Sequence, residues 1–156
     1  MPVIFDNIEN HLTEALNYTL DVSHKADFCV GYFNLRGWKH IAHHIESWNG
    51  GEDNCCRLLV GMQKPAQDIL RDYFANENSE AIDNQTAIQI RKKLAQDFKD
   101  QLTIGTQSAI DEKGLQRLSK QIKENKVVVK LFLRHSLHAK LYLCYRNDKI
   151  NPIVGI

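Results

Sequence analysis

Two residues near the C-terminus, His138 and Lys140, have side-chain types and a spacing that suit phosphate chemistry. Residues two apart in an extended strand direct their side chains to the same face. A neutral imidazole nitrogen can attack phosphorus and form a phosphohistidine, which divides one difficult displacement into two easier ones. A lysine beside it neutralises phosphate oxygens and stabilises the charge of the transition state. The pair therefore predicts a phosphodiester-cleaving site in which fixed cations act in place of a metal or cofactor.

The segment around this pair, residues 137–145, alternates in polarity as a strand does. His138, Lys140, Tyr142 and Cys144 are expected on one face, and the apolar residues between them on the other. A solvated strand face also explains an isolated His-x-Lys triplet. The pattern alone therefore leaves a purely structural role open.

Hydrophobic periodicity predicts the other elements. Buried strands are expected at residues 27–33, 57–62, 127–133 and 153–156, and helices at 7–20 (with Asp6 as its N-cap), 38–48, 65–75, 86–102 and 111–124. Two strand–helix units followed by a strand-rich end predict an α/β fold, with a layered mixed β-sheet flanked by helices. The last expected strand breaks off at Ile156, which suggests that residues 1–156 are a single domain from the N-terminal part of a longer protein.

Charge is distributed unevenly along the 156 residues, although the net charge is only +1. Residues 1–56 contain eight acidic and three basic side chains, for a net charge of −5, whereas residues 113–149 contain two acidic and ten basic ones, for a net charge of +8. A polyanion would be attracted to the C-terminal part. Lys113, Arg117 and Lys120 share one face of an expected helix and are candidate contacts to a DNA backbone. A solvated helix face explains them equally well.

Composition favours an intracellular protein. No apolar run approaches the roughly 20 residues that cross a bilayer, and the N-terminus has no secretory pattern, so a cytoplasmic location is expected. The four cysteines are expected to be free thiols, because Cys55 and Cys56 are adjacent, which is poor spacing for a metal knuckle.

Around the His-x-Lys pair, the segment Arg134-His135-Ser136-Leu137-His138-Ala139-Lys140-Leu141-Tyr142-Leu143 resembles the catalytic strand of the phospholipase D superfamily. The segments 30–33 and 57–61 also resemble the first two strands of phospholipase-D-like domains found at the N-terminus of bacterial helicase-type and restriction-associated proteins. The resemblance implies a phospholipase-D-like half, a nucleic acid substrate (DNA above all) and a helicase domain in the parent protein. His138 would be the nucleophile or its paired acid, and Lys140 the phosphate anchor.

The sequence also departs from the family pattern. Tyr145 occupies the position of the usual Asp, and the expected Gly-Ser-x-x-Asn element would fall after Ile156. The family combines two His-x-Lys copies, whereas this chain has one. The resemblance therefore implies either a homodimer, with its twofold axis close to His138, or a second phospholipase-D-like half elsewhere.

Two alternatives and several weaker candidates remain open. The fold could serve as a non-catalytic DNA-binding or dimerisation module, with the missing Asp as its sign. A lipid-directed phospholipase is the least favoured, because no interfacial apolar surface is evident.

His135 is a candidate phosphate contact. His40 and His44 have the spacing of a helical metal pair but lack the accompanying Glu. Tyr32, Phe33 and Trp38 are interpreted as core residues.

Overall fold

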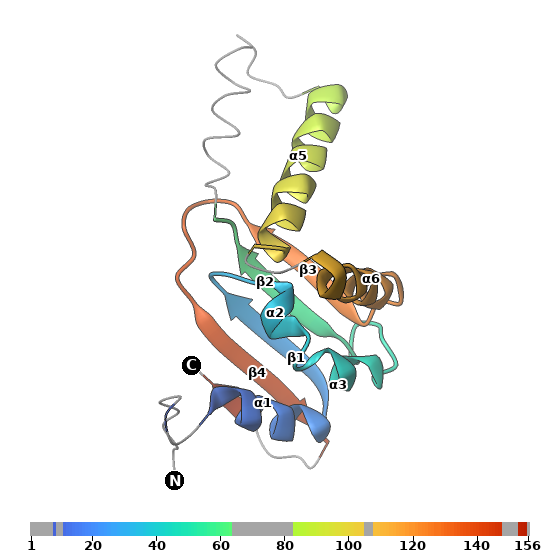
Figure 1. The fold of residues 1–156 in the computed structure, drawn as a ribbon, viewed down its shortest axis with the longest axis vertical. Helices are drawn as coiled ribbons and strands as arrows, with labels where there is room; N and C mark the ends of the chain where they lie inside the picture. Colours follow the sequence, from blue (N-terminus) through green and yellow to red (C-terminus); the bar gives the residue numbers. More distant parts are fainter. Residues whose placement is uncertain (1–7, 9–10, 64–82, 105–107, 148–152, 156) are drawn as a thin grey trace.

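One mixed five-stranded sheet organises the residues described by the computed structural model, which are 8, 11–63, 83–104, 108–147 and 153–155 (Figure 1). Its strands are β1 (Ser23–Val30), β2 (Cys56–Gly61), β3 (Val127–Phe132), β4 (Lys140–Arg146) and β5 (Ile153–Gly155). Their spatial order is β3-β2-β1-β4-β5. The strands β1, β2 and β3 are parallel, and β4 and β5 continue the sheet in antiparallel pairs. The predicted α/β class with a mixed sheet is confirmed.

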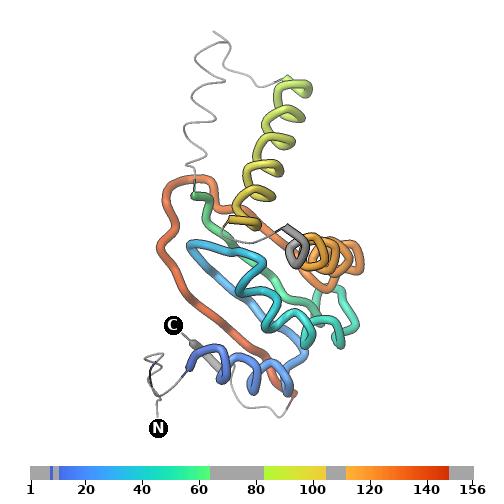
Figure 2. The backbone as a smooth tube through the Cα atoms, in the orientation of Figure 1, coloured from blue at the N-terminus to red at the C-terminus, as the bar shows by residue number. Residues whose placement is uncertain are grey.

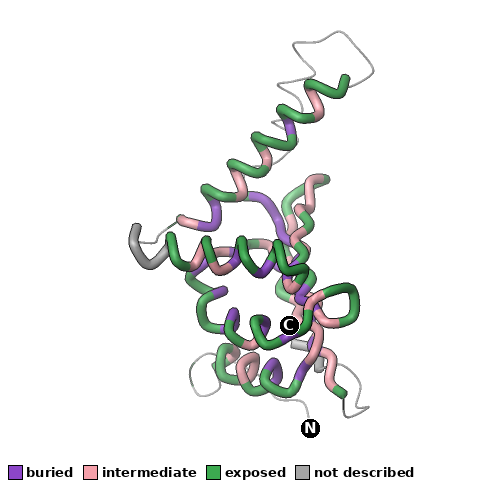
Figure 3. The backbone as a smooth tube through the Cα atoms, turned by 90° about the vertical axis from the view of Figure 1, so that its right-hand side faces the viewer, coloured by how far each residue is buried: buried purple, intermediate pink, exposed green. Residues whose placement is uncertain are grey.

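Helices cover one face of this sheet. They are α1 (Leu12–Asp21), α2 (Leu35–Trp38), α3 (Ala42–Glu46), α5 (Asn84–Leu102) and α6 (Ser108–Lys123). Seen along the edge of the molecule, α5 projects beyond the other helices (Figure 3). The covered face carries the alternate residues Ala26, Phe28 and Val30 of β1, each at most 6% exposed. Their neighbours in register on β2, Cys56, Leu58 and Val60, are also buried. Burial of this apolar face is the main force that holds the layers together.

The helix α5 is joined to the end of β2 by a buried glutamine. The Gln101 side-chain oxygen accepts a hydrogen bond from the Gln63 backbone N–H at 2.9 Å, and its amide donates to the Gly61 carbonyl at 3.1 Å. On the same helix, Phe98 stacks on Phe33 with ring centroids 6.5 Å apart. These contacts fix the carboxyl end of β2, where the chain leaves the sheet.

The helix predicted at residues 38–48 is wrong in its bounds, because the chain forms two short helices there. Asn34 begins α2, and its side chain accepts a hydrogen bond from the Gly37 N–H at 3.0 Å. This cap starts α2 at Leu35, three residues before the predicted helix. The chain then leaves helical geometry at Ile41, whose φ of −120° precedes α3. The break allows Trp38 and Ile45 to enter the core together.

Several element ends also differ from prediction. The helix α1 begins at Leu12 rather than residue 7, with His11 as an N-cap whose side chain makes no capping bond. The helix α5 begins at Asn84 because the Asp83 carboxylate accepts from the Thr86 N–H at 2.6 Å. Ile122 of α6, expected in the core, is 41% exposed. The predicted N-cap at Asp6 and the predicted helix at 65–75 lie outside the described residues.

No helix among the described residues is long and apolar enough to span a membrane. All four cysteines are free thiols. Cys56 and Cys144 are fully buried in the sheet, and this burial raises the pKa of Cys144 to about 11. These thiols therefore act as small core residues and not as nucleophiles.

Candidate functional site

The segment 133–139 connects β3 to β4 and crosses the carboxyl ends of β2 and β1 (Figure 2). It carries His138, which was predicted inside a strand, but β4 begins only at Lys140. The reason is that β1 ends at Val30, the partner of Lys140, so no strand continues beside His138. A single hydrogen bond from the Gly31 N–H to the Ala139 carbonyl, 2.8 Å long, extends the pairing past the strand end.

Two glycines allow this crossing segment to lie close to the sheet. A Cβ atom at Gly31 would lie 2.3 Å from the Leu137 carbonyl oxygen, and one at Gly61 would lie 2.6 Å from the Gly31 carbonyl oxygen. Neither strand end therefore accommodates a side chain. Because both residues are glycines, the segment that carries His138 can pass close to the ends of β1 and β2.

A pocket of about 640 Å³ opens beneath the crossing segment, at the carboxyl ends of β1 and β2. Both His138 and Lys140 line it, as do Tyr32, Gln63 and Tyr142. β1 has the parallel strand β2 on one side and the antiparallel strand β4 on the other. Ligands of open α/β sheets commonly bind at the carboxyl ends of the parallel strands. That His138 and Lys140 serve one functional site stays a prediction.

The register of β4 on β1 defines the face on which Lys140 lies. Lys140 pairs with Val30 and Tyr142 with Phe28, so both side chains are on the helix-covered face of the sheet. Lys140 is nevertheless exposed, because it lies at the end of the strand and beyond the helices. The site thus presents an exposed imidazole and an exposed ammonium group above a half-buried phenol.

Tyr145, at the position of the expected Asp, lies away from this pocket. It is five residues from Lys140 on the opposite face of β4, and its hydroxyl donates a 2.9 Å hydrogen bond to the Asp27 carboxylate. The same carboxylate receives a bidentate hydrogen bond from the Arg57 guanidinium. A carboxylate is therefore held beside this position by β1, although β4 supplies none. Tyr145 itself does not line the pocket.

Electrostatics at this second cluster are governed by the arginine. The hydrogen bond from Arg57 lowers the pKa of Asp27, partial burial opposes the shift, and the Tyr145 hydroxyl adds to the lowering. Partial burial, with a further contribution from the same carboxylate, raises the pKa of Tyr145. The cluster is therefore a charged Asp–Arg pair with a neutral phenol at neutral pH, a structural link between β2, β1 and β4.

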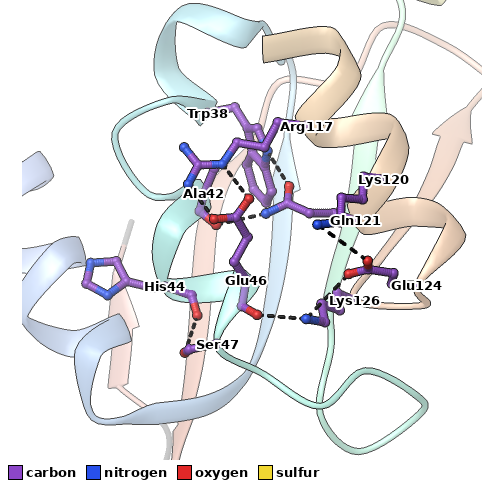
Figure 4. A network of polar contacts seen from close by, with 10 residues as sticks. All are labelled: Trp38, Ala42, His44, Glu46, Ser47, Arg117, Lys120, Gln121, Glu124 and Lys126. Carbon is purple, nitrogen blue, oxygen red and sulfur yellow. Dashed lines mark hydrogen bonds and ion pairs between the residues drawn. The ribbon is translucent and has the colours of Figure 1, made fainter. Parts of the chain in front are cut away.

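The other predicted phosphate contacts are dispersed. His135 is exposed on the crossing segment, where its ring contacts Phe132 edge to face with centroids 4.8 Å apart. Arg117 is bonded to Glu46 of α3 through two hydrogen bonds of 2.7 and 2.5 Å (Figure 4). The Lys120 Nζ lies 3.8 Å from the Glu124 Oε1, and Lys113 is exposed. The last three residues lie on α6 and none lines the pocket of His138.

The histidines at 40, 43 and 44 do not form a metal pair. His40 lies in the turn before α3, whereas His44 lies within it, bonded at 2.9 Å to the Asn17 side-chain oxygen. Burial, with a smaller contribution from His43, lowers the pKa of His44. Among the residues that the structure describes, no group of three or more His, Cys, Asp or Glu side chains is arranged to hold a metal.

Sequence reasoning missed four residues of the site. Gly31 and Gly61 lie near the ends of two predicted strands, where a glycine indicates close backbone approach. Tyr142 was placed on the face of His138 and Lys140 without a role. Tyr32, interpreted as core, is 39% exposed at the rim of the pocket, so that interpretation is wrong.

No protein-family model matches this chain, and no curated protein matches it either.

Proposed function

We propose that the chain is a phosphodiesterase domain that acts on nucleic acid through a phosphohistidine at His138. The observation that carries the proposal is the joint presence of His138 and Lys140 in one pocket at the carboxyl ends of β1 and β2. The resemblance of residues 134–143 to the phospholipase D superfamily agrees with it. By the same resemblance, the domain would work beside a helicase or a restriction enzyme.

In this mechanism His138 attacks phosphorus and the leaving oxygen takes a proton from a second histidine. The phosphohistidine is then hydrolysed by water, which restores the imidazole. Lys140 neutralises the phosphate oxygens throughout. Because this chain carries one His-x-Lys pair, the second histidine is expected from another copy of the chain or from a second phospholipase-D-like half.

Support for an exposed nucleophile comes from the surroundings of His138. The residue is exposed and lines the pocket, and in the described part of the chain no carboxylate forms an ion pair with its ring. Lys140 lines the same pocket, and Arg134 lies on the crossing segment. A phosphate group entering the pocket therefore meets the Lys140 ammonium group beside the imidazole.

The test is hydrolysis of a single-stranded DNA oligonucleotide and of bis(4-nitrophenyl) phosphate in the presence of EDTA. We expect His138→Ala to abolish both activities, and Lys140→Gln to lower them at least tenfold. The matched control is His43→Ala, an exposed histidine on α3 that does not line the pocket. Undiminished hydrolysis by His138→Ala would refute the proposal. DNA binding without hydrolysis by the unaltered chain would favour the non-catalytic module instead.

A further inference from the structure

A second recess of about 210 Å³ lies beside the pocket of His138, between α1, β1 and α2. Its walls come mainly from apolar and aromatic side chains, which are Leu12, Leu16, Phe28, Val30, Tyr32, Phe33, Trp38, Ile41 and Tyr142. The remaining described lining residues, Thr13, Asn34, Gly37 and His40, include no Asp, Glu, Lys or Arg. The recess therefore suits an uncharged group and not an anion.

The recess and the phosphate pocket are adjacent. Val30, Tyr32 and Tyr142 line both cavities. Tyr142 is the next residue after Lys140 on the same face of β4, about 7 Å further along the strand at the usual rise per residue. A ligand with its phosphate at Lys140 can thus place an attached group directly into the recess.

Two tyrosines form the boundary between the cavities. Tyr32 follows β1 and is 39% exposed, whereas Phe28, within β1, is 4% exposed. Tyr142 is half-buried and meets the Phe28 ring edge to face, with centroids 5.0 Å apart. Burial raises the pKa of Tyr142, so its hydroxyl is neutral and able to donate a hydrogen bond at neutral pH.

Two polar groups of the recess are used within the protein. The Trp38 indole N–H donates to the Gln121 side-chain oxygen at 3.0 Å, and the Asn34 oxygen accepts from the Gly37 N–H. The rest of the lining is mainly apolar and aromatic, with the polar side chains of Thr13 and His40 and the two tyrosines among it. Such surfaces bind nucleobases by stacking, with little dependence on sequence.

We infer that this recess is the binding site for the nucleobase next to the phosphate held by His138 and Lys140. Tyr32 and Tyr142 provide the aromatic contact, and the neutral walls exclude the backbone phosphates from the recess. The substrate class is then a single strand or an unpaired nucleotide, because a base within a duplex is stacked and paired. The inference rests on the proposed function for the identity of the group at His138.

The experiment compares the binding of two oligonucleotides by fluorescence anisotropy in EDTA, with chains that carry His138→Ala and are therefore expected to cleave neither strand. One is a short thymidine strand, and the other has the same length and phosphates but abasic residues throughout. Because stacking of one base contributes a factor of about ten or more in affinity, we expect the thymidine strand to bind at least tenfold more tightly. Equal affinity for the two strands, or no binding of either, would overturn the inference.

Two variants locate the effect. Tyr32→Ala removes an aromatic contact, and Thr13→Trp fills the recess from an exposed position on α1. Both should reduce the preference for bases at least fivefold and leave the affinity for the abasic strand unchanged. The matched control is Tyr18→Ala, which removes a tyrosine that is 77% exposed and lines neither cavity. An unchanged preference in both pocket variants, or the same loss in the control, would place the base elsewhere.

The failure of this inference is distinguishable from failure of the proposed function. A base preference that depends on Tyr32, in a protein that hydrolyses no phosphodiester, would keep the recess and reject the enzyme. Hydrolysis that depends on His138 and is equal for thymidine and abasic strands would keep the enzyme and reject the recess. Thermal unfolding of each variant establishes that it is folded before its binding is compared.

Discussion

At the scale of single residues, Asp27 of β1 makes a polar link between three strands of the sheet. Its carboxylate is bonded to Arg57 on β2 and to Tyr145 on β4, so one side chain of the central strand links both neighbours. A bidentate Arg–carboxylate pair is a strong and directional form of this contact. The charge lies on the sheet face opposite Lys140, which assigns it to stability and not to phosphate binding.

This link predicts a dependence of stability on pH. Arg57 lowers the pKa of Asp27 below its ordinary value of 3.8, so the stabilisation is complete above that value. It is lost as the pH falls through the lowered pKa. Asp27→Asn should therefore lower the free energy of unfolding by about 1 kcal/mol at neutral pH, with a smaller difference in acid.

Urea unfolding of the wild type and of Asp27→Asn, at neutral pH and in steps below 3.8, measures this difference. The control is Asp53→Asn, which removes a 90% exposed carboxylate 3.7 Å from Lys25 and should have little effect. A gap between wild type and Asp27→Asn that stays constant into acid would contradict the assignment.

At the scale of elements, the crossing segment 133–139 depends on the bare backbone at Gly31. Gly31→Ala would place a Cβ 2.3 Å from the Leu137 carbonyl oxygen, so the segment must move away from β1. We expect a loss of about 1–3 kcal/mol in the free energy of unfolding, as for other overpacked sites, together with loss of hydrolysis because His138 is displaced.

Gly37→Ala is the control for this substitution. A Cβ there would meet the Asn34 side-chain oxygen at 3.7 Å, an ordinary contact, and Gly37 lies in a helix. Its stability should be equal to wild type or slightly higher, because alanine is favoured over glycine in helices. Chemical unfolding compares the two variants, and equal effects would show that the close approach at Gly31 is unimportant.

The helices are joined to one another by the buried side chain of Gln121, which is 1% exposed. It accepts from the Trp38 indole N–H and donates to the Ala42 carbonyl at 2.8 Å, so α6 is fastened to α2 and α3 (Figure 4).

Gln121→Leu would leave two buried groups without partners, which typically costs about 1–3 kcal/mol for each group. Gln116→Leu, on the exposed side of the same helix, should be nearly neutral. Urea midpoints of the two variants test this, and similar losses in both would argue against the network.

The elements also show where sequence reasoning succeeds and where it fails. The cores of β1, β2 and β3 were predicted because their apolar runs are local signals. The break between α2 and α3 was not, since it depends on the packing of Trp38 and Ile45 into a shared core. His138 and Lys140 were placed together by strand alternation, but His138 lies before β4, so it is the crossing segment and not alternation that brings both to the pocket. The close approach of the crossing segment to Gly31 could not be predicted, because that contact joins residues about one hundred positions apart in the sequence.

At the scale of the whole molecule, the chain contributes one His-x-Lys pair, whereas the proposed mechanism uses two histidines. If two copies complete the site, each must supply His138, one as nucleophile and one as general acid. A mixed dimer of wild type with His138→Ala would then be inactive. With random pairing in an equimolar mixture, about half of the wild-type chains fall in such dimers.

Hydrolysis of bis(4-nitrophenyl) phosphate is therefore expected to fall by about half when wild type is refolded together with an equal amount of His138→Ala, as random twofold pairing requires. Mixing with His43→Ala, which retains His138, should cause no loss. The activity per chain should also decrease on dilution as dimers dissociate. Activity that is unaffected by the inactive chain, and constant on dilution, would contradict a shared site. It would indicate either that the second histidine comes from another phospholipase-D-like half, or that one copy is sufficient.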